Sequence, residues 1–318
     1  MENWWSKMNI EGFQKWKKLG RVIETGTSVK GVDILHSMDP SIAQIKDDEH
    51  RLYFSNRNEL NQSLIYSIDL SLDDPTNSTN FNPSPILLPG ELGAFDDNGV
   101  TASCVVKDDG TWLLYYIGWK PRSTTRFGLM TGLAISEDEG KTFKRYSRAP
   151  ILNLTDKEPF SILTAPYVLK VNGNWMMWYV SCTSWVEPDL PKYNIKLATS
   201  KNGRTWEQEG IICLDYMDEN EVALARPCVY FNEDIFYMWF SYKTLSDGYN
   251  IGFAHSTDGI SWQRNDELVG ITRSKSGWDS EMIEYPYVVP FKNDLFMFYN
   301  GNRYGETGAG VAVLRDIL

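Results

Sequence analysis

The segment His36-Ser37-Met38-Asp39-Pro40-Ser41-Ile42 joins an acid–proline step to a strand-like run. A proline or a carboxylate recurs at the corresponding place of later segments, which begin near Asp97, Ala165, Arg226 and Tyr285. Successive starts are separated by 58, 68, 61 and 59 residues. This spacing predicts five copies of one unit arranged in a ring, with the start of each unit at the centre.

A second mark of the repeat is an apolar, aromatic run about ten residues after each start. Turn residues such as Asp, Asn and Gly precede every copy. Strands that are apolar on both faces are typical of stacked sheets, where both faces are buried. The copies are 51–55, 112–116, 175–179, 236–240 and 295–299.

A third mark is a polar hairpin turn in the segments 136–143, 200–206 and 256–262. These turns resemble the Asp boxes of propeller glycosidases, in which a short polar side chain bonds its own backbone and Gly takes the positive φ. We interpret them as structural. With the hairpin, each unit has four antiparallel strands, which is the blade of a β-propeller. The predicted class is therefore all-β, a five-bladed β-propeller.

The last unit lacks an outer strand, because the sequence ends soon after its third strand, 310–314. Residues 13–24 have the form of an outer strand, so we predict that they complete the fifth blade and close the ring, which would hide an exposed edge. An ordinary N-terminal strand on another sheet is the alternative. The predicted organisation is a single domain, 1–318, with blades at 33–90, 91–155, 156–218, 219–275 and 276–318 plus 13–24.

Charge and composition restrict the classes of partner that the protein is expected to bind. The chain of 318 residues has 42 acidic and 31 basic residues and a net charge of −11, which argues against nucleic acid. The four cysteines show no CxxC pair or metal-ligand spacing, so buried thiols, no metal and no cofactor are expected. No apolar run reaches signal-peptide or membrane-span length, and we predict a cytoplasmic protein without a membrane span.

The blade pattern places inner-strand starts and the loops between strands 2 and 3 at one end of the ring. Asp39, Asp97 and Glu284 gather there as candidate catalytic carboxylates. Aromatic rings beside polar groups suit a carbohydrate, because rings stack on sugar C–H faces while polar groups bond hydroxyls. The candidate substrate-binding residues are His36, Arg57, Trp119, Arg126, Trp185, Arg226, Tyr285, Asn300 and Arg303.

The same loops are rich in cations, which favours an anionic ligand such as a uronic acid or a sugar phosphate. Acidic residues in these loops leave an ordinary solvated rim as the alternative. The cations are Arg57, Lys120, Arg122, Arg126, Lys192, Lys243 and Arg303, and the acids are Glu59, Glu187, Asp189, Asp247 and Glu306.

Five units, Met38-Asp39-Pro40 and later inner-strand carboxylates resemble the five-bladed propeller glycosidases, a superfamily of arabinanases, xylosidases, invertases, levansucrases and mannoside phosphorylases. The resemblance implies that Asp39 is the base or nucleophile, that Asp97 orients the substrate or tunes a pKa, and that Glu284 is the general acid. In arabinanase-like members the acid usually comes from an earlier blade than the fifth. Here the third blade has only Thr164 before Ala165-Pro166, and the fourth has Glu219 and Glu221 upstream of Arg226.

The sequence therefore predicts a glycoside-processing enzyme, a hydrolase or a glycosyl transferase type, acting on a small sugar that is anionic or activated. A catalytically silent, carbohydrate-binding propeller is the alternative. A sialidase-like enzyme is disfavoured, because those enzymes have six blades and an arginine trio, whereas only Arg226 lies on an inner strand here.

Overall fold

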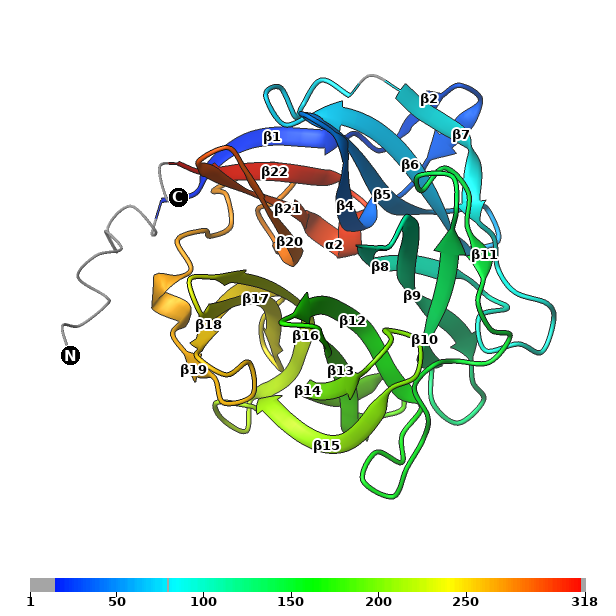
Figure 1. Cartoon of the computed structure of the whole chain (residues 1–318), viewed down its shortest axis with the longest axis vertical. Helices are drawn as coiled ribbons and strands as arrows, with labels where there is room; N and C mark the ends of the chain where they lie inside the picture. The colour runs from blue at the N-terminus through cyan, green and yellow to red at the C-terminus, as the bar shows by residue number, and fades with distance from the viewer. Residues whose placement is uncertain (1–14, 79, 316–318) are drawn as a thin grey trace.

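The computed structural model describes residues 15–78 and 80–315. Within these residues the chain is almost entirely β, and the only α- or 3-10-helical elements are η2 (Asp266–Leu268) and α2 (Asn302–Gly305). Figure 1 shows the sheets standing around a common centre. In the described part of the chain, no helix is long and apolar enough to cross a membrane.

Strands that follow one another in sequence pair as antiparallel neighbours, which gives consecutive groups of four. The apolar runs predicted as second strands are the second strand of every group. The groups are β4 (Met38–Lys46), β5 (Glu49–Arg57), β6 (Ser63–Ser71) and β7 (Asn80–Leu87); β8 (Val100–Asp108), β9 (Thr111–Pro121), β10 (Phe127–Ser136) and β11 (Lys144–Arg145); β12 (Ile162–Val171), β13 (Asn174–Glu187), β14 (Leu190–Ser200) and β15 (Glu207–Leu214); β16 (Glu221–Asn232), β17 (Ile235–Thr244), β18 (Asn250–Ser256) and β19 (Gln263–Arg264); and β20 (Glu284–Phe291), β21 (Asp294–Asn300) and β22 (Ala309–Leu314), joined by β1 (Lys17–Ile23).

The last group combines the two ends of the chain. β1 runs antiparallel to β22, from Lys17 opposite Val313 to Ile23 opposite Ala309, and Figure 1 shows the two strands side by side. Of the segment expected to complete the last unit, residues 13 and 14 lie outside the described residues. A short hairpin of β2 (Thr27–Val29) and β3 (Val32–Ile34) then leads into β4.

The first strands of the groups meet at the centre. β4 contacts β8, β8 contacts β12, β12 contacts β16, β16 contacts β20, and β20 contacts β4. Behind them, the second strands are buried along most of their length, which confirms the prediction of strands covered on both faces. Their large side chains, such as Trp178, Trp239 and Phe298, are fully buried, and each removes a large apolar area from water.

Packed side chains also lie between the first strands at the centre. The rings of Tyr167 on β12 and Tyr287 on β20 lie 5.6 Å apart, and the Tyr287 hydroxyl contacts Cys104 on β8. Cys104, Cys182, Cys213 and Cys228 are all buried and unbridged, as expected. Burial raises the pKa of Cys104 to about 11. The thiols therefore behave as small apolar core groups.

The predicted Asp-box turns connect the third and fourth strands of their groups. The Asp138 carboxylate accepts hydrogen bonds from the backbone N–H groups of Lys141 and Thr142, at 3.1 and 3.0 Å. Although burial opposes ionisation, hydrogen bonds from Thr142 and Ser136 lower the pKa of Asp138 to about 2. Asn202 and Asp258 make the same backbone contacts in the other two turns. The side chains of Asp138, Asn202 and Asp258 therefore form their hydrogen bonds within their own turns.

Candidate active site

A pocket of about 240 Å³ opens where the first strands begin and the second strands end. The sequence predicted that first-strand starts and second-strand ends lie at the same end of the molecule, because antiparallel pairing brings the start of one strand next to the end of its partner. Six predicted site residues line the pocket: Asp39, Arg57, Trp119, Arg126, Arg226 and Tyr285.

A repeated backbone feature turns four side chains into this pocket. Asp39, Ala165, Arg226 and Tyr285 each precede a proline and have left-handed φ values of 54°, 48°, 49° and 57°. Each lies at a register shift of its strand pair. Proline disfavours the right-handed α conformation in the residue before it and offers no N–H to the ladder, which favours a bulge. Left-handed backbone costs about 1–3 kcal/mol per non-glycine residue and is concentrated at functional sites.

Asp39 is 5% exposed and is held from two sides. Its Oδ1 lies 3.1 Å from Nε of Arg226, and its backbone N–H donates to Oδ1 of Asn300 at 3.1 Å. Burial raises the pKa of Asp39, while the charges of Arg226 and Arg57 oppose that rise. The adjacent guanidinium therefore favours the ionised carboxylate in an otherwise dry environment.

Arg226 is the fixed cation of the pocket. It is 4% exposed, and its Nη1 donates to the Ala102 carbonyl at 3.0 Å and to Oγ of Ser103 at 2.8 Å. These two bonds connect the Arg226 side chain on β16 to β8 across the centre of the molecule. Nη2 of Arg226 has no hydrogen-bond partner among the described residues.

Glu284 begins β20, is fully buried and faces Asn300 in the β20–β21 ladder. Neither carboxylate oxygen has a hydrogen bond of ordinary geometry within the described residues. Burial raises the pKa of Glu284 well above its usual value, and the charge of Asp39 raises it further, while the Asn300 amide, Lys243 and Arg226 oppose the rise. Burial raises the pKa of both carboxyl groups, but Glu284 has no cation in contact and its pKa is raised well above the usual value, so Glu284 is the better candidate for the protonated form.

Glu284 is buried near three tyrosines that line the pocket. Tyr249, Tyr285 and Tyr304 line the pocket, and the charge of Glu284 reaches all three hydroxyls. Glu284 does not itself line the pocket. It is therefore closed off from the pocket in this conformation, and we call Tyr249, Tyr285 and Tyr304 the tyrosine wall.

The predicted equivalence of Asp97 with Asp39 is wrong. In the second group the register shift falls between Ala102 and Cys104, several residues after Asp97. Asp97 lies in the loop before β8 and accepts bonds from Lys120 at 2.7 Å and from the Gly93 N–H at 2.8 Å. Although burial opposes ionisation, these bonds lower the pKa of Asp97. Asp97 does not line the pocket, so Asp39 and Glu284 come together without it.

The other predicted site residues surround the pocket without lining it. Trp185 packs on Phe127 of the wall, with ring centroids 5.9 Å apart. His36 is half-buried, and burial and the charge of Arg57 lower its pKa. Asn300 is fully buried and links Asp39 to the strand opposite Glu284. Arg303 has a largely exposed side chain near Glu281 and Glu306.

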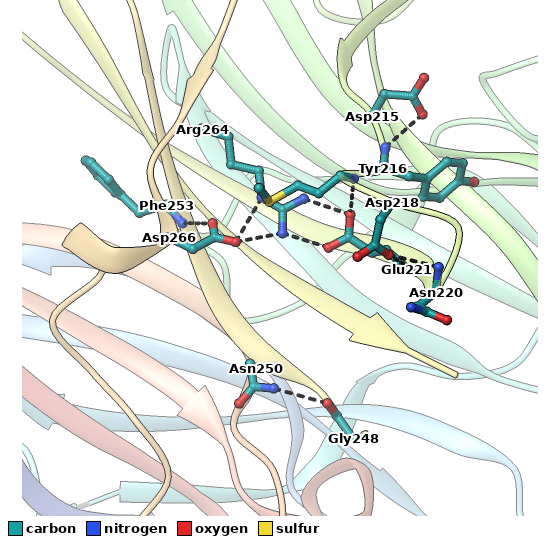
Figure 2. A network of polar contacts seen from close by, with 11 residues as sticks. Asp215, Tyr216, Asp218, Asn220, Glu221, Gly248, Asn250, Phe253, Arg264 and Asp266 are labelled. Atoms are coloured by element: carbon teal, nitrogen blue, oxygen red, sulfur yellow. Dashed lines mark hydrogen bonds and ion pairs between the residues drawn. The ribbon is translucent and has the colours of Figure 1, made fainter. Parts of the chain in front are cut away.

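Buried acids anchor the sheets just before several first strands. Asp96, Glu158 and Asp279 each accept a hydrogen bond from a tyrosine hydroxyl of the second strand and face a cation. In the fourth group Arg264 donates to both oxygens of Glu221, at 2.8 and 2.7 Å, and also to Asp266 (Figure 2). Glu221 is therefore part of a structural network and does not line the pocket.

Sequence reasoning missed several residues of the wall. Lys243 was recognised only as a loop cation, and Tyr193 and Tyr249, whose hydroxyls hydrogen-bond each other, were not singled out. Both tyrosines lie near the starts of third strands, β14 and β18. Their position near third-strand starts could have identified them, because third strands begin at the end of the molecule where second strands finish.

No protein-family model matches the chain. Two curated Mycobacterium tuberculosis proteins are each 36% identical over 302 residues, which cover 95% of this chain and 99% of theirs: uncharacterized protein Rv1502 (strain H37Rv) and uncharacterized protein MT1551 (strain CDC 1551). The chain belongs to the Rv1502 family. A 1,2-beta-oligomannan phosphorylase of Thermoanaerobacter sp. is 28% identical over 131 residues, 40% of this chain and 43% of that protein.

Solved structures of glycoside hydrolases share the fold of this chain. A glycoside hydrolase has a TM-score of 0.71 at 16% identity, and the match covers 94% of this chain and 92% of that protein. A thermostable family-43 glycoside hydrolase has a TM-score of 0.66 at 13% identity, covering 92% of each chain. At these identities the likeness shows the fold, and at that level it confirms the predicted resemblance.

Proposed function

We propose that this member of the Rv1502 family is a glycoside-processing enzyme, a hydrolase or a glycosyl transferase type, that uses Asp39 and Glu284. The observation that carries the proposal is the pair itself. Two buried carboxyl groups come from the first and last strand groups beside a pocket, the charge of Asp39 raises the pKa of Glu284, and only Asp39 has a cationic partner in contact. Glycosidic bond cleavage requires one carboxylate and one carboxylic acid.

The surroundings assign the two roles. Asp39 lines the pocket in its ionised form and acts on the anomeric carbon, either directly or through water. Glu284 holds a proton and donates it to the leaving oxygen. For this step Glu284 needs access through the tyrosine wall. Tyr304 is 40% exposed, and both it and Arg303 have left-handed backbone in α2, so a movement of this strained loop would open the wall.

We further propose that the strand groups are the five blades of one propeller domain, 1–318, closed by β1. The cycle of contacts among the first strands and the pairing of β1 with β22 support this interpretation. A closed ring explains how carboxyl groups that are 245 residues apart in sequence become neighbours. The partial similarity to an oligomannan phosphorylase supports a carbohydrate ligand.

A screen for turnover tests the proposal. The purified protein is incubated with a panel of aryl glycosides, oligosaccharides and glycosyl phosphates, and sugar release or transfer is followed by chromatography. We expect turnover of at least one class of glycoside. A protein that binds sugars from the panel and turns over none of them would instead be a silent carbohydrate-binding propeller. The burial of Glu284 behind the wall is the observation that favours this second function.

A further inference from the structure

The pocket is positively charged in a strongly acidic protein. Four cations line it, Arg57, Arg126, Arg226 and Lys243, against two acids, Asp39 and Asp189. The chain as a whole has a net charge of −11. A wall with more cations than acids therefore reverses the sign of the surrounding surface, and such a local field attracts anions.

Three of these cations lack an acidic partner. Asp39 is already paired with Arg226, whereas Arg57, Arg126 and Lys243 have no carboxylate within ion-pair distance among the described residues. Nη1 of Arg57 donates only to the Asn61 side chain, at 3.2 Å. Arg57 and Lys243 are partly buried, where a cation without an acidic partner is costly unless an anion joins it, whereas Arg126 is exposed to solvent.

Arg57 and Arg126 line the same pocket from different strand groups. Arg57 ends β5, and Arg126 directly precedes β10. Burial lowers the pKa of Arg57, the charge of Asp39 opposes this effect, and the charge of Arg126 adds to it. Two guanidinium groups that repel each other across a pocket are well placed to share the oxygens of one ligand group, because guanidinium binds planar and tetrahedral oxyanions through paired hydrogen bonds.

We propose that Arg57, Arg126 and Lys243 bind a compact oxyanion, a phosphate or a carboxylate, beside the sugar that Asp39 attacks. The oxyanion is either carried by the sugar or enters as the free ion. The role of Asp39 in this statement rests on the proposed function, whereas the anion site rests on the cations alone. The unpartnered Nη2 of Arg226 supplies a further donor at the buried side of the pocket.

Isothermal titration calorimetry of the full chain tests the site without requiring turnover. The probes are inorganic phosphate, glucose 1-phosphate and glucuronate, with glucose as the neutral control. At least one anionic probe is expected to bind more tightly than glucose, with an affinity that falls as NaCl is raised. In Arg57→Gln and Arg126→Gln this affinity should fall about tenfold or more, as expected for loss of a charge-assisted hydrogen bond.

Arg148→Gln is the matched control, because Arg148 is highly exposed, pairs with Glu91 and lies outside the pocket. Its affinity for the anionic probe should equal that of the wild type. Binding of inorganic phosphate identifies the free ion as the ligand, and binding of the sugar-linked probes alone identifies an anionic sugar. The proposal is overturned if no anionic probe binds more tightly than glucose, or if all three substitutions weaken binding equally.

The same titrations separate this proposal from the enzymatic one. If the protein turns over neutral glycosides but binds no anion, the proposed anion site is wrong and the proposed enzymatic function stands. If anion binding depends on Arg57 but no glycoside of the panel is turned over, the proposed enzymatic function is wrong and the proposed anion site stands.

Discussion

The Asp39→Asn variant is expected to lose turnover by about 10²–10⁴-fold, the usual contribution of a positioned acid–base group. Asn keeps the size of the side chain but can neither accept a proton nor attack the anomeric carbon. Initial rates on a glycoside that the wild type turns over provide the measurement. Because the substitution leaves the Arg226 charge buried without its acid, thermal melting of the variant is recorded and rates are compared below its transition.

Asp97→Asn is the matched control for this prediction. It makes the same chemical change in a residue that the sequence also suggested, but the structure pairs Asp97 with Lys120 outside the pocket. We expect this variant to keep the wild-type rate within the scatter of the assay. Full activity in Asp39→Asn, or inactivity in Asp97→Asn with an intact fold, would show that the catalytic carboxylate has been misassigned.

Arg226→Met is expected to destabilise the protein by about 3–5 kcal/mol, the typical effect of removing one partner of a buried ion pair. The substitution leaves Asp39 buried without its cation and also removes the bonds to Ala102 and Ser103 that tie β16 to β8. The free energy of unfolding from urea titrations measures the effect. In the double variant Asp39→Asn/Arg226→Met the loss should be smaller than the sum of the single losses.

Arg51→Met provides the control for the position of the ion pair. Arg51 and Asp69 form another buried pair, at 2.7 Å, and neither residue lines the pocket. We expect a comparable loss of stability without a change in the glycoside rate measured on the folded protein. An Arg226→Met variant as stable as the wild type would contradict the assigned role of this pair.

The sequence was sufficient to find most of the central strand starts, where the structure has bulges, because proline leaves a visible mark. At Asp39, Ala165, Arg226 and Tyr285 the following proline both signals and favours the bulge. The second group has no proline there, so the spacing of acids was used instead and pointed to Asp97, before the actual shift at Ala102–Cys104. A bulge without proline or glycine has no comparably clear sequence signal.

The burial of Glu284 could not be predicted from the sequence. The tyrosines that cover it come from two other parts of the chain, the start of β18 and the loop α2, and their ring positions depend on packing between sheets. For the same reason Asn300, which resembles a sugar-binding amide in sequence, serves as an internal link to Asp39. Side-chain depth within the ring follows from tertiary packing and has no local pattern.

The most direct test of the carboxyl pair compares the unfolding free energy of the wild type and Glu284→Gln between about pH 4.5 and pH 8. In the unfolded chain Glu284 ionises near its ordinary value of 4.5, whereas in the folded protein its pKa is raised. In this window the folded wild type binds the additional proton, so its stability falls with rising pH by up to about 1.4 kcal/mol per unit. Glu284→Gln lacks this loss.

The stability of Glu284→Gln relative to the wild type should therefore rise with pH above about 4.5 and level off only beyond the folded-state pKa of Glu284. That result would show a protonated carboxyl group beside the Asp39 carboxylate near neutral pH, the state that acid catalysis requires. A stability difference that stays constant across the whole range would mean that Glu284 ionises in the folded protein as it does in the unfolded chain, and it would contradict the proposed acid.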